Sequence, residues 1–110
     1  MSEQDPIVIV GGARTPMGGM QGDFTPVTAS QLGAGAMGAA MHRAGIQGDD
    51  VDEVIMGNVL GAGQGQAPAR QASKGAGIPD AGGATTLNKM CGSGLKAALF
   101  GHDLRVAGSA

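Results

Sequence analysis

The sequence predicts an α/β protein with a mainly parallel sheet, in the order strand, helix, strand, helix, strand, helix. Three observations support this fold class. Short β-branched or apolar runs alternate with longer segments of helical spacing, and glycine or proline separates these segments. Strands that alternate with helices normally pair in parallel through right-handed crossovers.

The N-terminal part contains the first expected strand and helix. Residues 7–10 are Ile-Val-Ile-Val followed by two glycines, which is typical of a short strand buried on both faces. After a loop rich in Gly and Pro, Thr28 or Ser30 can cap a helix that runs to Ala44 and ends at Gly45.

The next strand and helix follow directly. The apolar run over residues 51–60 predicts a second strand, which ends at Gly-Ala-Gly. Pro68 suits the first turn of a second helix, and Gly75 and Gly77 break it.

The last expected strand covers residues 84–90, and Cys91 begins the third helix. The large apolar side chains of this helix spread around it, and small residues lie between them. The large apolar residues are Leu95, Leu99, Phe100, Leu104 and Val106. A helix that is apolar over most of its surface is normally buried inside a larger protein. We therefore expect a buried helix that has Cys91 at its start.

The composition also indicates part of a larger domain. The chain has 22 Gly, 5 Pro and 18 Ala, against only 20 Leu, Ile, Val and Phe together, with no Trp or Tyr and a single Cys. Small domains need large apolar side chains or disulfides to build a core. A net charge of only −2 argues against disorder as the explanation.

Several classes of protein are excluded by the same features. The first ten residues lack a secretory signal, and no apolar run approaches the roughly 20 residues of a membrane span. The seven Lys and Arg are scattered, which argues against a nucleic-acid surface. A single free Cys is typical of a reducing compartment, so we expect a cytoplasmic protein.

Three groups of residues match site patterns weakly. Gly33-x-Gly35-x-x-Gly38 lies inside the first helix rather than at a strand-to-helix turn, so we expect close helix packing and not dinucleotide binding. The acidic cluster in residues 49–53 lacks the calcium-loop spacing, so we expect a solvated turn and no metal site. On a regular helix, His102 lies about 16 Å from Cys91 and cannot be its base, and we expect His42 to have a surface or packing role.

Cys91 is the strongest candidate site residue. It lies in Met-Cys-Gly-Ser-Gly, where a strand changes to a helix. The helix dipole and unpaired N–H groups favour a thiolate there, and a backbone N–H can stabilise an oxyanion. An unreactive buried cysteine is the alternative, although the placement favours a nucleophile. Ser93 is a weaker candidate, because Cys91 occupies the first glycine position of the G-x-S-x-G pattern.

Four ordered segments resemble the thiolase family, and most closely its acetyl-CoA acetyltransferases. They are residues 13–16 (ARTP), 53–59 (EVIMGNV), 65–72 (GQAPARQA) and 88–97 (NKMCGSGLKA). The resemblance extends over essentially the whole chain. Its main small departure is Ala67, where Asn is common, and its large departure is length, since residues 1–110 correspond to a partial N-terminal thiolase domain.

The resemblance implies that Cys91 takes an acyl group from acyl-CoA as a thioester, with its backbone N–H in an oxyanion hole. Two acetyl-CoA would then give acetoacetyl-CoA, or the reverse, as in fatty acid metabolism. Coenzyme A would be a substrate and not a cofactor, and the complete protein a homotetramer or homodimer. The family's catalytic His, second Cys and most CoA-contacting residues lie further along, so we expect the chain alone to be inactive.

Two alternatives remain open at this stage. One is a β-ketoacyl synthase-like acyltransferase that uses carrier-protein thioesters. The other is a non-catalytic binding or assembly module in which Cys91 is structural.

Overall fold

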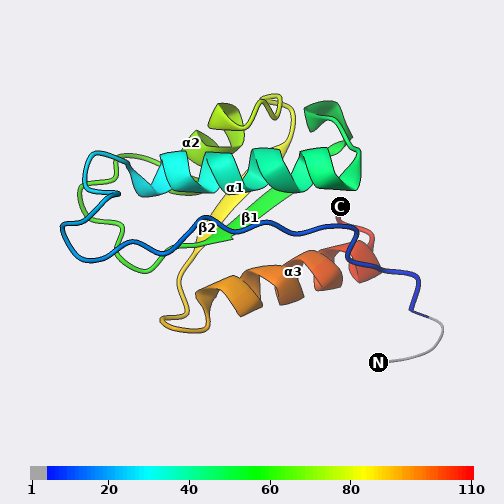
Figure 1. Cartoon of the computed structure of the whole chain (residues 1–110). Helices are drawn as coiled ribbons and strands as arrows, with labels where there is room; N and C mark the ends of the chain where they lie inside the picture. The colour runs from blue at the N-terminus through cyan, green and yellow to red at the C-terminus, as the bar shows by residue number, and fades with distance from the viewer. Residues whose placement is uncertain (1–4) are drawn as a thin grey trace.

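The computed structural model describes residues 5–110, which form an α/β fold with a two-stranded parallel sheet (Figure 1). Helices α1 and α2 pack together on one face of the sheet, and α3 packs on the other. The elements in chain order are α1 (Ala29–Ala44), a short 3₁₀ turn (Gly48–Asp50), β1 (Glu53–Gly57), α2 (Pro68–Gly75), β2 (Gly83–Leu87) and α3 (Ser93–Ala107).

Two loops begin at the carboxyl ends of the strands. Strands β1 and β2 are parallel, with Glu53 opposite Gly83 and Gly57 opposite Leu87. The Asn58 N–H extends the pairing by donating to the Leu87 carbonyl at 2.9 Å. The loops that follow β1 and β2 therefore start side by side.

The predicted helices α1 and α2 are confirmed. Thr28 caps α1 by accepting the Gln31 N–H at 3.1 Å, while the Gln31 side chain accepts the Thr28 N–H at 2.8 Å. Gly45 ends the helix in the left-handed conformation, with φ 71°. Pro68 begins α2 as expected from its fixed φ and missing N–H.

The predicted strand over residues 7–10 is wrong, because this segment pairs with neither β1 nor β2. It is drawn as a trace that passes between α1 and α3 (Figure 1), and the Ile9 side chain is 93% exposed. The segment is held to the rest of the fold by contacts with helix α1, and not by hydrogen bonds to a neighbouring strand. Arg43 donates to the Gly12 carbonyl at 3.0 Å, and Gly11 lies against Ala44.

Both remaining strands are shorter than the sequence predicts. The strand expected over 51–60 ends at Gly57, and the one expected over 84–90 ends at Leu87. The second ends early because Asn88 and Met90 begin a tight turn, in which Met90 has φ 48°. A left-handed residue cannot continue a strand.

Small residues make the helix pair close. A Cβ on Gly33 would lie 3.2 Å from the Ala72 Cβ, and one on Gly75 would lie 2.9 Å from the Ala34 Cβ. Gly33 of the Gly-x-Gly-x-x-Gly segment therefore serves helix packing. The buried apolar core is correspondingly small: Val54, Ala69, Ala72, Ile78 and Ala97.

Helix α3 is buried only at Ser93 and Ala97, so residues 5–110 do not supply the cover that its apolar sequence predicts within a larger protein. The sheet covers one side, and within residues 5–110 no helix or strand packs on the opposite side. Leu95 is accordingly 71% exposed. No helix in the described part of the chain has the length and apolar character needed to cross a bilayer.

Candidate active site

The candidate site is the loop between β2 and α3, residues 88–92. It leaves the carboxyl edge of the parallel sheet, where α/β proteins commonly place their ligand-binding and catalytic loops. Side chains form hydrogen bonds with the backbone of the loop, so the loop adopts a defined turn conformation.

Five hydrogen bonds shape this turn, one of them from the Ser93 N–H to the Met90 carbonyl at 3.1 Å. The Met90 N–H donates to Asn88 Oδ1 at 2.9 Å, and the Gly92 N–H donates to the Lys89 carbonyl at 3.0 Å. Ser93 Oγ accepts the Lys89 N–H at 2.9 Å and donates to the Met90 carbonyl at 2.6 Å. Both residues just before Cys91 are therefore held in place.

The residue directly before Cys91 carries backbone strain. Met90 has φ 48°, a region that residues other than Gly adopt at a cost of roughly 1 kcal/mol or more. Such strain persists only where surrounding contacts enforce it, and it is concentrated at functional sites.

Cys91 is a free and exposed cysteine. The expectation of a buried cysteine, given as the alternative, is therefore wrong for residues 5–110. The structure also corrects its position, because α3 is capped by Gly92 and begins at Ser93, so that Cys91 lies just outside the helix. Among the described residues no acceptor takes the Cys91 N–H, and the nearby helix start favours an anion.

Gly57 is a site residue that the sequence reasoning missed. It ends β1, and the first turn of α3 lies directly on it. A Cβ on Gly57 would be 2.6 Å from the backbone carbonyl carbon and Cβ of Ser93 and 2.8 Å from the Gly94 nitrogen. The signal in the sequence was a glycine inside the run expected to be a strand, which can mark a close backbone approach.

Ser93, the weaker nucleophile candidate, has a different role in the structure. It is only 5% exposed, and its hydroxyl both accepts and donates within the Cys91 loop. A hydroxyl so engaged is not presented to a substrate.

The two histidines lie away from Cys91. His102 Nε2 is 2.7 Å from Asp5 Oδ2, and its Nδ1 is 3.3 Å from Asp103 Oδ1. The Asp5 hydrogen bond is the main cause that raises the pKa of His102 above its ordinary value, and it lowers the pKa of Asp5. His42 lies in the last turn of α1, at the end of that helix away from the Cys91 loop (Figure 1).

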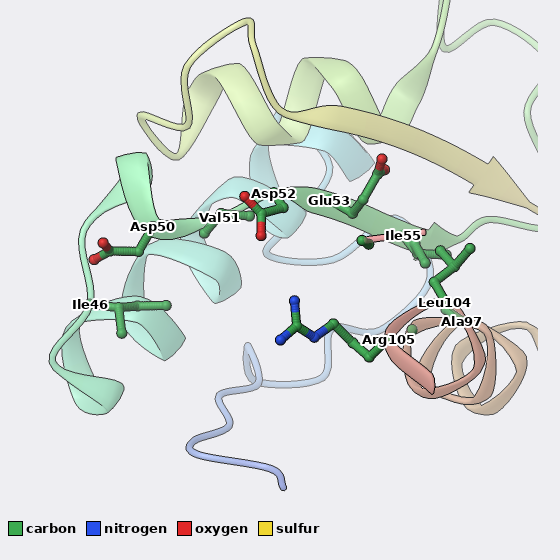
Figure 2. Close-up of a pocket in the computed structure, with 11 residues that line it drawn as sticks. Ile46, Asp50, Val51, Asp52, Glu53, Ile55, Ala97, Leu104 and Arg105 are labelled. Carbon is green, nitrogen blue, oxygen red and sulfur yellow. The ribbon is translucent and has the colours of Figure 1, made fainter. Parts of the chain in front are cut away.

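The acidic residues border a separate hollow of about 570 Å³ at the amino end of β1. Figure 2 shows Asp50, Asp52 and Glu53 on one side of it, with the Arg105 side chain extending from α3 on the other. Because β1 starts here, the hollow is at the opposite end of the sheet from Cys91. Within residues 5–110 no three His, Cys, Asp or Glu side chains group in a way that could hold a metal ion.

Comparison with known proteins gives a consistent result. The thiolase N-terminal domain matches residues 7–109. The cytosolic acetyl-CoA acetyltransferase of Gibberella zeae is 52% identical over 101 residues, which cover 92% of this chain and 26% of the relative. The mitochondrial acetyl-CoA acetyltransferase of Xenopus tropicalis is 50% identical over 102 residues, which cover 93% and 24%.

A solved structure shows the same fold. The crystal structure of the Acat5 thiolase from Ascaris suum in complex with coenzyme A aligns with a TM-score of 0.89 and 35% identity. The alignment covers 91% of this chain and 26% of that chain. This chain thus spans about a quarter of the length of the proteins it matches.

Proposed function

The chain belongs to the thiolase family, and from this premise we propose that it is the nucleophile-bearing part of an acetyl-CoA acetyltransferase. We further propose that residues 1–110 are a partial N-terminal thiolase domain. The observation that carries the proposal is the exposed Cys91, held on a hydrogen-bonded turn directly before a helix.

This geometry supports the first half-reaction. The Cys91 sulfur attacks the carbonyl carbon of acetyl-CoA, and a new C–S bond forms. The carbonyl oxygen takes up negative charge, which the free Cys91 N–H stabilises. When the oxyanion collapses, the bond to the coenzyme A sulfur breaks, and the proton from Cys91 ends on the departing thiol. Acetyl-Cys91 and free coenzyme A result.

The second half-reaction needs groups that these residues do not provide. A second acetyl-CoA must lose a proton from its methyl carbon before that carbon attacks acetyl-Cys91 to give acetoacetyl-CoA. Cys91 is the only cysteine, and His102 is bound to Asp5. We therefore propose that the chain alone completes no catalytic cycle in either direction.

We propose the remaining functional assignments by analogy with the family. Coenzyme A thioesters serve as substrates, with no separate cofactor, and the reaction belongs to fatty acid metabolism. The complete protein assembles as a homotetramer or homodimer, without nucleic-acid or membrane partners. A cytoplasmic location is supported by the single free cysteine and by the name of the Gibberella relative, whereas the Xenopus relative is named as mitochondrial.

Acetylation of the purified chain tests the proposal. The 110-residue chain is incubated with acetyl-CoA, and acetyl transfer to Cys91 is followed by mass spectrometry, with Cys91→Ala as the control. We expect the folded chain to be acetylated faster than the same chain in urea. We also expect no more than one equivalent of coenzyme A to be released, and no thiolysis of acetoacetyl-CoA.

Each alternative outcome has a defined meaning. Equal acetylation rates in the folded and unfolded chain would contradict the role of Cys91 as an activated nucleophile. Repeated turnover that depends on Cys91 would contradict the inactivity of the chain alone. Acetylation from a carrier-protein thioester, but not from acetyl-CoA, would favour the β-ketoacyl synthase alternative.

A further inference from the structure

We propose that Ser93 is a positioning residue for Cys91, which it serves by fixing the strained turn before the nucleophile. The proposal rests on the proposed function, in which Cys91 is the acyl-accepting residue. It assigns to Ser93 a task other than helix capping or catalysis.

The direction of the Ser93 hydrogen bonds shows that they serve the loop. A serine that caps a helix accepts N–H groups two or three residues further along the chain. The Ser93 hydroxyl points backward instead, to the Lys89 N–H at 2.9 Å and the Met90 carbonyl at 2.6 Å. Gly92 occupies the capping position.

One of these bonds holds the Asn88–Lys89 peptide group, one residue before the strained Met90, and the other holds the Met90–Cys91 peptide group. The Lys89 N–H lies before Met90, and the Met90 carbonyl lies between Met90 and Cys91. Without these two bonds, fewer hydrogen bonds oppose the return of Met90 from φ 48° to an ordinary conformation: the Ser93 N–H still donates to the Met90 carbonyl at 3.1 Å, and the Met90 N–H to Asn88 Oδ1 at 2.9 Å. Because the Met90 carbonyl leads directly into the Cys91 nitrogen, that return would rotate the Cys91 N–H and side chain.

The end of strand β1 supports Ser93. A Cβ on Gly57 would approach Ser93 to 2.6 Å, so the backbone of β1 supports the first turn of α3. The start of the loop is held by the same strand end, because the Asn58 N–H donates to the Leu87 carbonyl at 2.9 Å. Both ends of the Cys91 loop are therefore fixed to the carboxyl end of β1.

The test compares Ser93→Ala with Ser73→Ala in the 110-residue chain. Ser73 is a matched control, because it is fully buried but its hydroxyl has no partner among the described residues. The readout is the rate of Cys91 alkylation by iodoacetamide as a function of pH, in the folded chain and in urea. Circular dichroism shows whether each variant is folded.

We expect Ser93→Ala, which removes two hydrogen bonds, to lower the folded-state rate at neutral pH by at least roughly three- to tenfold, the range that the loss of one of them allows, and to shift the pH profile toward that of the unfolded chain. Ser73→Ala should leave both unchanged, and Ser93→Thr, which restores a hydroxyl, should recover part of the rate. An unchanged profile in a folded Ser93→Ala variant would overturn the proposal. If wild-type Cys91 reacts equally in the folded and unfolded chain, the proposed function itself fails.

Amide hydrogen exchange in the wild-type chain provides a second measurement that does not depend on a variant folding. The Lys89 N–H is bonded to Ser93 Oγ, whereas the Cys91 N–H has no acceptor in the described residues. We expect Lys89 to exchange more slowly than Cys91. Equal and fast exchange at both would overturn the positioning role.

Discussion

At the scale of single residues, the clearest features are two of the three left-handed backbone positions that residues other than glycine occupy in the described part of the chain. Met90 precedes Cys91 with φ 48°, and Ala67 precedes α2 with φ 47°. The two differ in their support. The Met90 carbonyl accepts a hydrogen bond from Ser93, whereas the Ala67 side chain makes no capping hydrogen bond. In α2, the Ala69 N–H donates instead to Thr86 Oγ1 at 3.0 Å.

Ala67→Asn should stabilise the chain. Asn tolerates the left-handed region better than Ala, so the free energy of unfolding should rise by about 0.5–1 kcal/mol. Urea denaturation followed by circular dichroism measures the change. The control Ala62→Asn places the same side chain in an exposed turn without a positive φ and should change the free energy by less than about 0.5 kcal/mol. Destabilisation at Ala67 would show that the strain is not relieved by Asn.

Ser73→Ala should also be stabilising. The Ser73 hydroxyl is fully buried in α2 without a hydrogen-bond partner, so its removal recovers about 1 kcal/mol of desolvation free energy. The contrasting variant is Ser30→Ala, which removes a hydroxyl bonded to the Pro68 carbonyl at 3.3 Å and should lower stability by about 0.5 kcal/mol. Thermal and urea unfolding of both variants decide the sign. A loss of stability in Ser73→Ala would indicate that its hydroxyl has a partner in solution.

At the scale of elements, local signals predicted the helices better than the strands. Thr28, Gly45 and Pro68 act within one helical turn, so their positions were enough to place the ends of α1 and α2. A strand needs a partner elsewhere in the chain, and the β-branched run at residues 7–10 contains no information on whether one is available. Cys91 was identified from its neighbours, but the backward bonds of Ser93 and the φ of Met90 depend on contact with β1 and could not be predicted locally.

The contact between the N-terminal segment and α3 should depend on pH. Asp5 Oδ2 is 2.7 Å from His102 Nε2, and this hydrogen bond raises the pKa of His102 above 6.5 and lowers the pKa of Asp5 below 3.8. The contribution of His102 to stability is complete below pH 6.5 and is lost as the pH rises through the raised pKa of His102 in the folded chain. The aspartate contribution is present above pH 3.8 and is lost as the pH falls through the lowered value.

The pair should therefore hold the segment most firmly between about pH 4 and pH 6.5. The imidazole chemical shifts of His102, followed by NMR during a pH titration, measure its pKa directly. Asp5→Asn should lower that pKa more than Asp103→Asn, because Asp5 is the larger cause and Asp103 the smaller. An identical His102 titration in wild type and Asp5→Asn would show that the contact is not formed in solution.

At the scale of the whole molecule, the chain covers too little of its own surface. It exposes 7654 Å² for a mass of 10.7 kDa, whereas a folded monomer of that mass exposes about 5,500 Å². Large apolar side chains contribute to this exposed surface, among them Val8, Ile9, Leu60 and Leu95. A groove of about 910 Å³ lies between the N-terminal segment and α3, bordered by Ile9, Leu95 and Leu99. The abundance of Gly and Ala thus leaves the hydrogen-bonded turn at Cys91 on a fold whose apolar side chains are largely exposed to solvent.

This surface should bind hydrophobic dyes and promote self-association. Large exposed apolar patches have that effect in soluble chains, and Ile9 is 93% exposed at the edge of the groove. Ile9→Gln should therefore reduce 8-anilinonaphthalene-1-sulfonate fluorescence and association in sedimentation velocity, with almost no change in Tm. Val54→Ala is the control, because Val54 is buried in β1 and its truncation should cost about 2 kcal/mol. An equal fall in Tm for both variants would mean that residues 7–10 are packed in solution and that the apolar groove is closed.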